Sequence, residues 1–278
     1  MGKSGEAMER LIEVMRRLRA GCPWDKEQDI RSLRPYLIEE CYEVLDEMDR
    51  VAQGGPWKPL GEELGDLMFQ IVFHACLAEE KGQFDLGDVA NAIADKLVSR
   101  HPHVFGELKL QGSTAVLENW AKLKAEERKK KTGNAGSVLD GVPSGAPGLQ
   151  RAERLTEKAS RIGFDWPDLR GVRGKLDEEL RELDEAIAQG DKGAIEHELG
   201  DVLFSLANLA RFVNTPAEDA VRQANKRFTS RFHHLEAKLD AAGRKFDKVP
   251  LDELNALWEE AKRVELKKSG EKERGEHA

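Results

Sequence analysis

Apolar residues recur at intervals of three and four positions along most of this chain. One such series is Leu33, Leu37, Cys41, Val44, Leu45 and Met48, and a second is Leu60, Leu64, Leu67, Met68, Ile71, Val72 and Ala75. This spacing puts the apolar side chains on one face of an α-helix. The Gly- and Pro-rich stretch between the two series, residues 54–59, predicts a loop. Because no stretch alternates strictly between apolar and polar residues, we expect an all-α fold with few or no strands.

A longer stretch rich in Gly and Pro divides the chain into two parts. Residues 132–148 (TGNAGSVLDGVPSGAPG) hold five Gly and two Pro and follow a run of charged residues. Such a composition is typical of a linker between domains. We therefore predict an N-terminal domain over 1–131, a linker over 132–150 and a C-terminal domain over 151–278. The tail after Lys268 is charged and poor in apolar residues, so we expect it to be disordered.

The two predicted domains carry the same landmarks in the same order. These are a Trp beside an Asp (24–25 and 165–166), two acidic segments (39–43 with 62–66, and 178–182 with 197–201), an apolar helix (67–78 and 202–212), a basic pair (Lys96/Arg100 and Arg227/Arg231) and a Trp with a Lys four residues on (Trp120/Lys124 and Trp258/Lys262). A repeated order of this kind predicts an internal duplication, and hence tandem helical modules.

The acidic segments contain carboxylates spaced three residues apart, which share one face of a helix. The first set is Glu40, Glu43, Glu63 and Asp66, and the second is Glu179, Glu182, Glu198 and Asp201. If the two helices of each module pack antiparallel, we expect the four carboxylates of a set to converge. Four like charges repel unless a cation lies between them. Oxygen-only ligands favour Mg²⁺ or Mn²⁺ over zinc.

Other interpretations of these acids stay open. Glu-rich helices commonly present only a solvated face, but Glu63 and Asp66 lie in an apolar helix, where an unpaired carboxylate is costly. Gly65 and Gly200 sit beside the acids, where glycine costs a helix about 1 kcal/mol, and we infer that they allow close helix approach. A di-iron bundle would need a Glu followed three residues later by His, and this sequence has none. A helical interaction module with vestigial acidic sites is the non-enzymatic alternative.

Composition and charge narrow the class of protein. Charged residues make up 35% of the chain and aromatic residues 6%, as in soluble proteins built from amphipathic helices. The net charge of −8 argues against direct nucleic-acid binding. The three cysteines form no CxxC pair, which favours a reducing compartment. The N-terminus has no apolar signal region, and the longest apolar stretch, 67–78, is too short to span a membrane, so we expect a cytoplasmic protein.

The motifs resemble those of the MazG family of all-α nucleoside triphosphate pyrophosphohydrolases. That family carries EExxE followed by EExxD, which residues 39–43 and 62–66 match in full. The second copy matches over 178–182, but His197 replaces the first acid of the second motif. The stretches CPWDKEQD, RHPHVFG, RIGFDW and HELGDVLFSLANLAR extend the resemblance over nearly the whole chain.

The resemblance implies Mg²⁺-dependent hydrolysis of nucleoside triphosphates, in which water attacks the α-phosphorus and pyrophosphate leaves. This activity would serve house-cleaning or nucleotide-pool control. The implied roles are metal binding by Glu179, Glu182, Glu198 and Asp201, further metal binding or water orientation by Glu178, and contact with the substrate by Lys175, His197, Asn225, Arg227, Arg231, Trp258 and Lys262. Glu40, Glu43, Glu63 and Asp66 would form a second metal site. Without the resemblance, Arg227 and Arg231 could be ordinary surface residues, and Trp258 could serve packing alone.

Assembly and the division of labour between the modules also follow as expectations. One helical hairpin cannot bury its apolar face alone, whereas hairpins from two chains can complete a four-helix bundle. We therefore expect a homodimer with its sites near the subunit boundary. Arginine grips phosphate bidentately and lysine does not. Since Arg227 stands where the first module has Lys96, we expect the C-terminal module to carry most of the activity.

Overall fold

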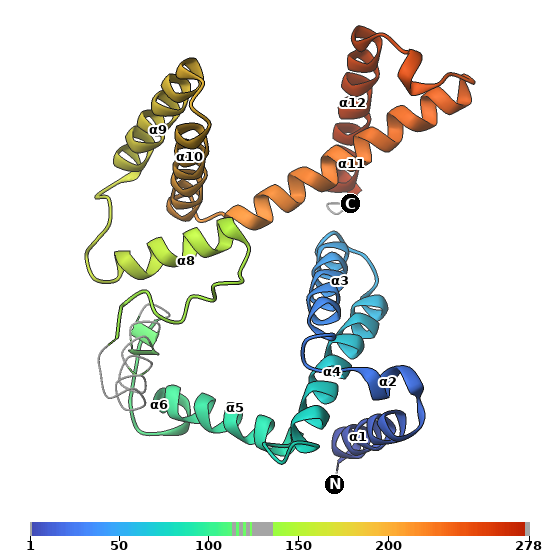
Figure 1. Cartoon of the computed structure of the whole chain (residues 1–278), viewed down its shortest axis with the longest axis vertical. Helices are drawn as coiled ribbons and strands as arrows, with labels where there is room; N and C mark the ends of the chain where they lie inside the picture. Colours follow the sequence, from blue (N-terminus) through green and yellow to red (C-terminus); the bar gives the residue numbers. More distant parts are fainter. Residues whose placement is uncertain (1, 113–114, 117–118, 121–122, 124–135, 276–278) are drawn as a thin grey trace. The chain divides into compact units, whose positions relative to one another are not determined.

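The computed structural model describes residues 2–112, 115–116, 119–120, 123 and 136–275, with side chains as far as residue 265. Every regular element in these ranges is helical and none is a strand, which confirms the all-α prediction (Figure 1). The chain separates into two compact units, residues 1–135 and 136–278, which are described one at a time below. The first residues of the predicted linker, 132–135, lie outside the described ranges.

The first unit is built around an antiparallel helical hairpin. Its helices are α1 (Lys3–Gly21), α2 (Pro23–Glu27), α3 (Arg34–Ala52), α4 (Trp57–Glu79), α5 (Leu86–Arg100) and α6 (Pro102–Phe105). Helices α3 and α4 pack side by side, and α1 packs against α4. The loop between α3 and α4 is shorter than the predicted 54–59, because α4 begins at Trp57 and includes Pro59 in its first turn. A proline is tolerated there, since the first amides of a helix have no partner inside the helix.

The core of the first unit lies where α1, the start of α3 and α4 meet. Met15, Leu33 and Phe73 are 0% exposed, and Val72 and Leu77 complete the cluster. Two ion pairs fasten α1 to the end of α4. The Arg16 guanidinium lies 2.9 Å from a Glu79 carboxylate oxygen, and that of Arg19 lies 2.6 Å from one of Glu80.

The second unit repeats the hairpin. Its helices are α8 (Gly148–Ser160), α9 (Leu169–Gln189), α10 (Lys192–Phe212), α11 (Ala217–Ala241) and α12 (Leu251–Gly275). Helices α9 and α10 form the hairpin, and α8 packs against α10. The turn is only two residues long. Gly190 ends α9 with a left-handed φ of 70°, and the Asp191 side chain caps α10 by accepting from the amides of Gly193 and Ala194.

Helices α11 and α12 form a second helix pair in this unit. The start of α11 contacts α8, and the amide of Ala217 donates to a Glu153 carboxylate oxygen over 3.0 Å. Farther along, Phe228 contacts the ring of Trp258, with ring centres 5.1 Å apart. Helix α12 continues to Gly275, so its backbone is helical beyond Lys268, where the sequence predicts disorder.

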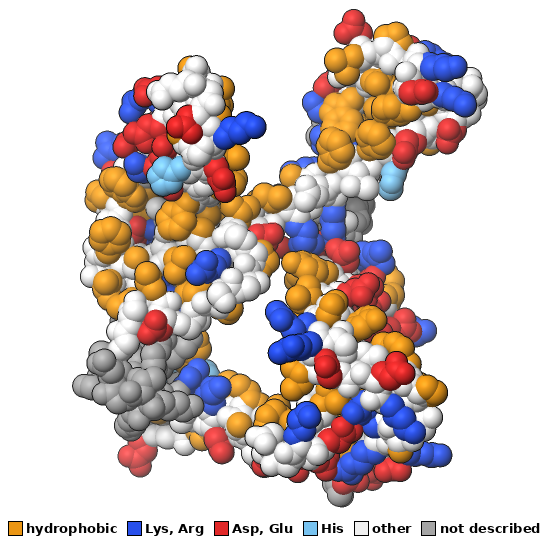
Figure 2. Space-filling model, in the orientation of Figure 1, with side chains coloured by type: hydrophobic (Ala, Val, Ile, Leu, Met, Phe, Trp, Pro, Cys, Tyr) orange, Lys and Arg blue, Asp and Glu red, His pale blue; other side chains and the backbone are white. Residues whose placement is uncertain are grey.

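Both hairpins leave a matching apolar stripe uncovered within their own unit. On α4 the stripe is Leu64, Met68 and Ile71, and on α10 it is Leu199, Leu203 and Leu206, each residue being 41–46% exposed. The acidic motifs place these residues at equivalent positions of the two units. Apolar side chains are accordingly visible at the surface of the molecule among the charged ones (Figure 2). None of the described helices is both long and apolar enough to cross a membrane.

Glycines beside the acidic segments do not bring helices closer inside either unit, contrary to the sequence interpretation. A Cβ atom added at Gly65 or at Gly200 would meet no atom within 4 Å. Both residues face outward from the hairpin to which they belong, as their exposure shows. Their place in the sequence therefore reflects no helix contact among the described residues of the units.

Candidate active site

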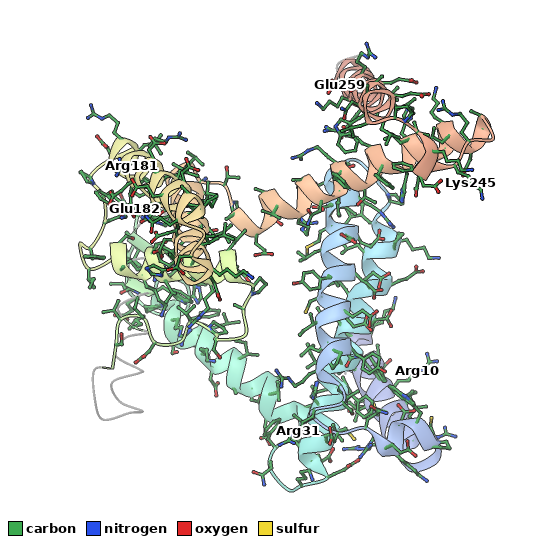
Figure 3. The ribbon with its side chains drawn as sticks, turned by 45° about the horizontal axis from the view of Figure 1, so that its top comes forward. Arg10, Arg31, Arg181, Glu182, Lys245 and Glu259 are labelled. Carbon is green, nitrogen blue, oxygen red and sulfur yellow. The ribbon has the colours of Figure 1, made fainter. Side chains whose placement is uncertain are left out.

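Each hairpin gathers acidic side chains from its two helices. In the second unit, carboxylate oxygens of Glu179, Glu198 and Asp201 all lie within 4.8 Å of one another, and in the first unit those of Glu40, Glu43 and Glu63 do so. These groups bring together three of the four acids predicted for each set. Asp66 and Glu182 (labelled in Figure 3) lie outside the close groups. Three oxygen ligands within this distance, on two helices, form a geometry that suits a hard divalent cation.

The electrostatics of both clusters show how closely the acids crowd. Burial first, and then the charges of Glu178 and Glu179, raise the pKa of Glu182 above the ordinary value for a glutamate. Burial and the charge of Asp66 likewise raise the pKa of Glu40. Glu182 and Asp66 are therefore near enough to interact electrostatically with the acids of the clusters. A divalent cation among these oxygens would relieve the repulsion, so the residues present fit Mg²⁺ or Mn²⁺.

One lysine stands at the acidic cluster of the second unit. The Lys175 ammonium lies 2.7 Å from a Glu179 oxygen and 3.0 Å from a Glu178 oxygen. Lys175 precedes Glu179 by four residues on α9, so the helix itself brings the two together. The hydrogen bonds to Glu179 and then to Glu178 raise the pKa of Lys175 above its ordinary value. The Lys175 ammonium therefore stays protonated over the whole physiological pH range.

His197 lies at the rim of the same cluster. Its Nε2 atom is 3.5 Å from an Asp201 carboxylate oxygen, and its side chain is 72% exposed. It faces solvent one turn before Asp201, which leaves it room to contact a ligand bound at the cluster. The sequence interpretation of His197 as a phosphate neighbour stays a prediction.

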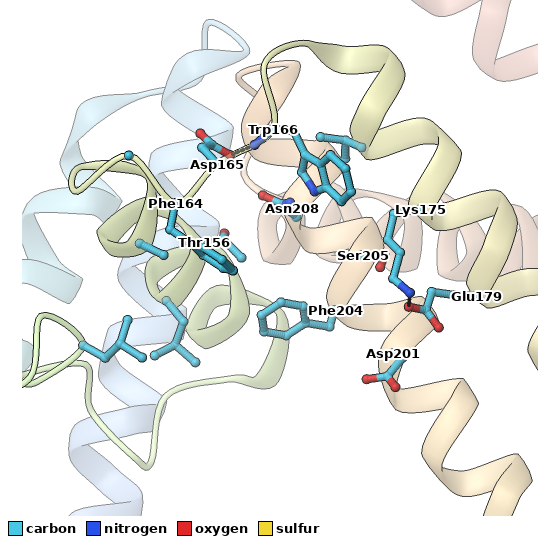
Figure 4. Close-up of a pocket in the computed structure, with 15 residues that line it drawn as sticks. Thr156, Phe164, Asp165, Trp166, Lys175, Glu179, Asp201, Phe204, Ser205 and Asn208 are labelled. Atoms are coloured by element: carbon cyan, nitrogen blue, oxygen red, sulfur yellow. Dashed lines mark hydrogen bonds and ion pairs between the residues drawn. The ribbon is translucent and has the colours of Figure 1, made fainter.

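A cavity of about 600 Å³ opens beside Glu179 and Asp201 (Figure 4). Helices α8, α9 and α10 and the loop before α9 line it. Lys175, Glu179 and Asp201 lie at one end, and Asp165 and Asn208 lie at the other. The rings of Phe164, Trp166 and Phe204 contribute aromatic surface, while Thr156 and Ser205 add hydroxyl groups.

Sequence reasoning missed Phe204, Ser205 and Asn208 as site residues. They follow Asp201 by three, four and seven positions, so one face of α10 carries them all toward the cavity. That periodicity was present in the sequence. What the sequence lacked was any sign that α8 and the loop at 163–166 leave space opposite this face.

In the first unit, different residues stand at the positions that line this cavity in the second. Alignment on the acidic motifs sets Phe73 against Asn208, Tyr36 against Lys175 and Leu33 against Val172. Phe73 and Leu33 are fully buried in the core, together with Met15. A space of about 10 Å³ borders this core, and one of about 330 Å³ lies where α1 meets the end of α4. Neither is lined by an acid of the first cluster. Tyr36 contacts Trp24 edge to face, with ring centres 5.7 Å apart, so an aromatic pair stands where the second unit has its lysine.

The remaining predicted substrate residues lie on α11 and α12, away from the wall of the cavity. Arg231 donates to Glu265 over 2.8 Å, and its guanidinium lies 5.7 Å from the ring centre of Trp258. Lys262 pairs with Glu259 at 2.6 Å. Among the described residues that line the cavity, none comes from α11 or α12. The structure thus joins Arg231 to Trp258 but does not join either to the acidic cluster of the same chain.

The first unit repeats part of this arrangement. The Arg100 guanidinium lies 5.6 Å from the ring centre of Trp120, as that of Arg231 does from Trp258. Lys124, the predicted counterpart of Lys262, lies outside the described residues. Equivalent Arg–Trp contacts at equivalent positions support the interpretation of the two units as copies of one ancestor.

Fold and site together define a class: an all-α protein with two helical hairpins, each carrying carboxylates suited to a divalent cation. The comparison with known families is more specific. The MazG nucleotide pyrophosphohydrolase domain matches residues 28–105 and 171–235, and the chain belongs to this family. Each matched segment contains both acidic motifs of its unit, as expected for tandem modules.

Relatives extend the similarity over almost the whole chain. The nucleoside triphosphate pyrophosphohydrolase of Escherichia coli strain K12 is 41% identical over 264 residues, which are 93% of this chain and 98% of that protein. The nucleoside triphosphate pyrophosphohydrolase/pyrophosphatase MazG of Thermotoga maritima is 41% identical over 265 residues, 94% of this chain and 98% of that protein. A relative from Mycolicibacterium smegmatis is 31% identical over 252 residues, 88% of this chain and 64% of that protein.

Proposed function

We propose that this protein hydrolyses nucleoside triphosphates to nucleoside monophosphates and pyrophosphate with Mg²⁺ or Mn²⁺, and that the second unit carries the reaction. The observation behind the proposal is the position of the cavity. A space of about 600 Å³, within the usual range for small-molecule sites, opens directly beside Glu179, Asp201 and Lys175. The family and the named activities of the relatives point to the same reaction.

The acidic end of the cavity would carry the chemistry. Glu179, Glu198 and Asp201, with Glu182 beside them, would hold the metal. Bound there, the metal would draw charge from phosphate oxygens and make a coordinated water more acidic. Lys175 would neutralise the triphosphate, since its ammonium already lies among these acids. Glu178, which binds Lys175 from the side, would orient the attacking water and accept its proton.

The bond changes follow from this arrangement. The water oxygen forms a bond to the α-phosphorus while the bond to the oxygen that bridges the α- and β-phosphates breaks. Pyrophosphate leaves with that bridging oxygen, and Glu178 would hold the proton lost by the water. No side chain needs to act as a covalent nucleophile in this scheme.

The apolar part of the cavity would take the ribose and base. Trp166, Phe164 and Phe204 offer flat aromatic surfaces on which a base can stack. Stacking of this kind binds every base to some degree, because each has an aromatic face. The fully buried ring of Phe73, which stands in the first unit where the second has Asn208, supports hydrolysis in the second unit. The cluster at Glu40, Glu43 and Glu63 would then bind metal without turning over substrate.

We further propose that the protein is a homodimer. The exposed stripes on α4 and α10 would be covered by the same stripes of a second chain, which would complete a four-helix bundle. Asn225, Arg227, Arg231, Trp258 and Lys262 would reach the acidic cluster across this boundary. This assembly would reconcile their implied role with their separation from the cluster of their own chain.

The test combines product analysis with a matched pair of variants. With Mg²⁺ present, we expect pyrophosphate and nucleoside monophosphate as the first products, and no turnover with EDTA. Glu182→Gln should lower the initial rate at least about tenfold, whereas its counterpart in the first unit, Glu43→Gln, should stay near wild type. Orthophosphate with nucleoside diphosphate would overturn the proposed reaction. Loss of turnover in Glu43→Gln alone would assign the reaction to the first unit.

A further inference from the structure

The end of the cavity opposite the acids carries a fixed polar network. Arg211 pairs with both carboxylate oxygens of Asp165, at 2.9 and 2.5 Å. The same guanidinium donates twice to Oδ1 of Asn208, over 3.1 Å from Nε and 2.8 Å from a terminal nitrogen. Asn208 and Arg211 are three residues apart on α10, so the helix holds them on one face. Asp165, in the loop before α9, holds the Arg211 guanidinium in place through the two hydrogen bonds that it accepts.

This network settles which end of the Asn208 amide meets a ligand. An arginine only donates hydrogen bonds, so the amide must turn its oxygen to Arg211. Two donors then occupy the two lone pairs of that oxygen. The amide nitrogen has no hydrogen-bond partner in the part of the chain that the structure describes, and Asn208 lines the cavity. Toward a ligand, Asn208 therefore offers N–H donors and no acceptor.

The position of Asn208 suits contact with the far edge of a bound base. Asp201, Ser205 and Asn208 follow one another along α10, so about 10 Å of helix separates the acidic end from the amide. Phe204 lies between Asp201 and Asn208 along α10, and Trp166 lines the same cavity (Figure 4). With the phosphates at the acids, ribose and base would extend past Phe204. The edge of the base that faces away from the sugar would then reach Asn208.

We propose that Asn208 is a specificity-determining residue that selects nucleotides whose base has a carbonyl oxygen on this far edge, at position 6 of a purine or position 4 of a pyrimidine. The inference rests on the proposed function of the same cavity. A carbonyl oxygen there accepts a hydrogen bond from the amide. An amino group at the same position sets donor against donor and leaves both without a partner, which costs binding free energy wherever the bound base excludes water from the amide. Hypoxanthine and guanine, or uracil and thymine, are therefore favoured over adenine and cytosine.

The sharpest test compares inosine triphosphate with adenosine triphosphate. At position 6 the inosine nucleotide carries an oxygen and the adenosine nucleotide an amino group. The neighbouring ring nitrogen is protonated in inosine and unprotonated in adenosine. For the wild type we expect kcat/KM to be at least about tenfold higher for the inosine nucleotide. Asn208→Leu keeps the approximate volume and removes the donor, so the ratio should fall toward one. Asn208→Asp keeps the shape and the Arg211 partner but can only accept, so the ratio should invert.

Binding of the product nucleotides gives a readout independent of turnover. By calorimetry without metal, inosine monophosphate should bind the wild type more tightly than adenosine monophosphate, and the Asn208→Leu variant should bind both alike. Thr156→Val alters another polar group of the same cavity, so it should keep the wild-type ratio. Circular dichroism checks that each variant folds. If a variant does not fold, the ratio of inosine to adenosine nucleotide binding in the wild type still tests the proposal.

The outcomes separate this inference from the function on which it rests. Wild-type ratios within about twofold of one, in both turnover and binding, would overturn the role of Asn208. So would a ratio that survives unchanged in Asn208→Leu. If no nucleoside triphosphate releases pyrophosphate, the proposed reaction fails, and the monophosphate binding ratios still decide whether Asn208 selects the base.

Discussion

Lys175 joins the acidic cluster to the cavity at the scale of single residues. Its ammonium contacts Glu178 and Glu179 and also lines the cavity. With a metal among the acids, the same ammonium would be free to turn toward phosphate oxygens. A lysine here would thus serve both states of the site, neutralising acids when substrate is absent and phosphates when it is present.

The first prediction concerns this lysine. Lys175→Met keeps the length of the side chain and removes its charge, so kcat/KM for nucleoside triphosphates should fall at least about tenfold. Lys175→Arg should restore part of the loss because it restores the charge. The control is Tyr36→Phe at the equivalent position of the first unit, which keeps the contact with Trp24. Steady-state kinetics decide the matter, and equal losses in Lys175→Met and Tyr36→Phe would contradict the assignment.

The pair formed by Asp165 and Arg211 makes stability depend on pH. The hydrogen bond from Arg211 holds the pKa of Asp165 below its ordinary value, against the opposing effect of burial. A carboxyl whose pKa is lower in the folded state stabilises the fold above its unfolded pKa, near 3.9. That stabilisation disappears as the pH falls through the folded pKa.

The second prediction follows from this direction of the pH dependence. At pH 7, Asp165→Asn should lower the free energy of unfolding by about 1 kcal/mol, or Tm by about 3 °C. Below about pH 4 the difference between wild type and variant should shrink. Thermal unfolding followed by circular dichroism across this range measures it. A difference that stays constant, or that grows toward low pH, would show that the carboxylate charge is not the cause.

At the scale of elements, the turn between α9 and α10 fixes how the acids meet. Gly190 has a φ of 70°, a conformation that costs a residue with a Cβ atom about 1–2 kcal/mol. The turn holds the helices antiparallel, and so sets Glu179 on one helix against Glu198 and Asp201 on the other. Strain at Gly190 should therefore be felt as a loss of stability of the whole hairpin.

The third prediction contrasts two glycines of this region. Gly190→Ala should lower the free energy of unfolding by about 1–2 kcal/mol, because alanine resists a positive φ. Gly174→Ala should raise it by about 0.5–1 kcal/mol, because Gly174 lies inside α9 and a Cβ there would meet no atom within 4 Å. Urea unfolding of both variants gives the two differences. The same sign for both would contradict the assigned role of the turn.

The periodicity of apolar and acidic residues predicts much of this fold but less of the site. The apolar series at 33–48 and 60–75 correctly predicts α3 and α4, and the three-residue spacing of Glu40 with Glu43 predicts their meeting with Glu63. Local spacing describes one helix at a time, however. It cannot show that Phe164 and Phe204, forty residues apart, enclose a cavity, nor that Arg211 orients the amide of Asn208. It also misled on the inside of the unit at Gly65, which faces outward and brings no helix of its own unit nearer.

At the scale of the whole molecule, duplication has let two copies of one module diverge. Both keep a hairpin, an acidic cluster and an exposed stripe. The second has a cavity beside its acids, whereas in the first a fully buried Phe73 stands where the second has Asn208. A filled core stabilises a unit, and an open cavity costs stability but admits a ligand. We therefore expect the second unit to bind the nucleotide, while both units contribute a stripe to assembly.

The fourth prediction concerns assembly. Two stripes of three large apolar residues, all more than 40% exposed, are more than a monomer ordinarily leaves uncovered on its helices. For a chain of 31.1 kDa we therefore expect a dimer mass of about 62 kDa by light scattering at micromolar concentration (2 × 31.1). A monomer mass for the wild type would contradict the proposed homodimer.

Substitutions in the stripes should locate the contact between the two chains, and one residue can be changed in each unit. Met68 and Leu203 stand at equivalent positions in the centre of the two stripes. Met68→Lys and Leu203→Lys should each weaken the dimer, since a buried lysine without a partner opposes association, and the double variant should be a monomer. Leu251→Lys is the matched control, because Leu251 is 70% exposed at the start of α12 and belongs to neither stripe. If Arg231 and Trp258 act on the acidic cluster of a second chain, the monomeric double variant should also lose turnover while its helices stay folded. A monomer with full activity would instead require each chain to complete its own site.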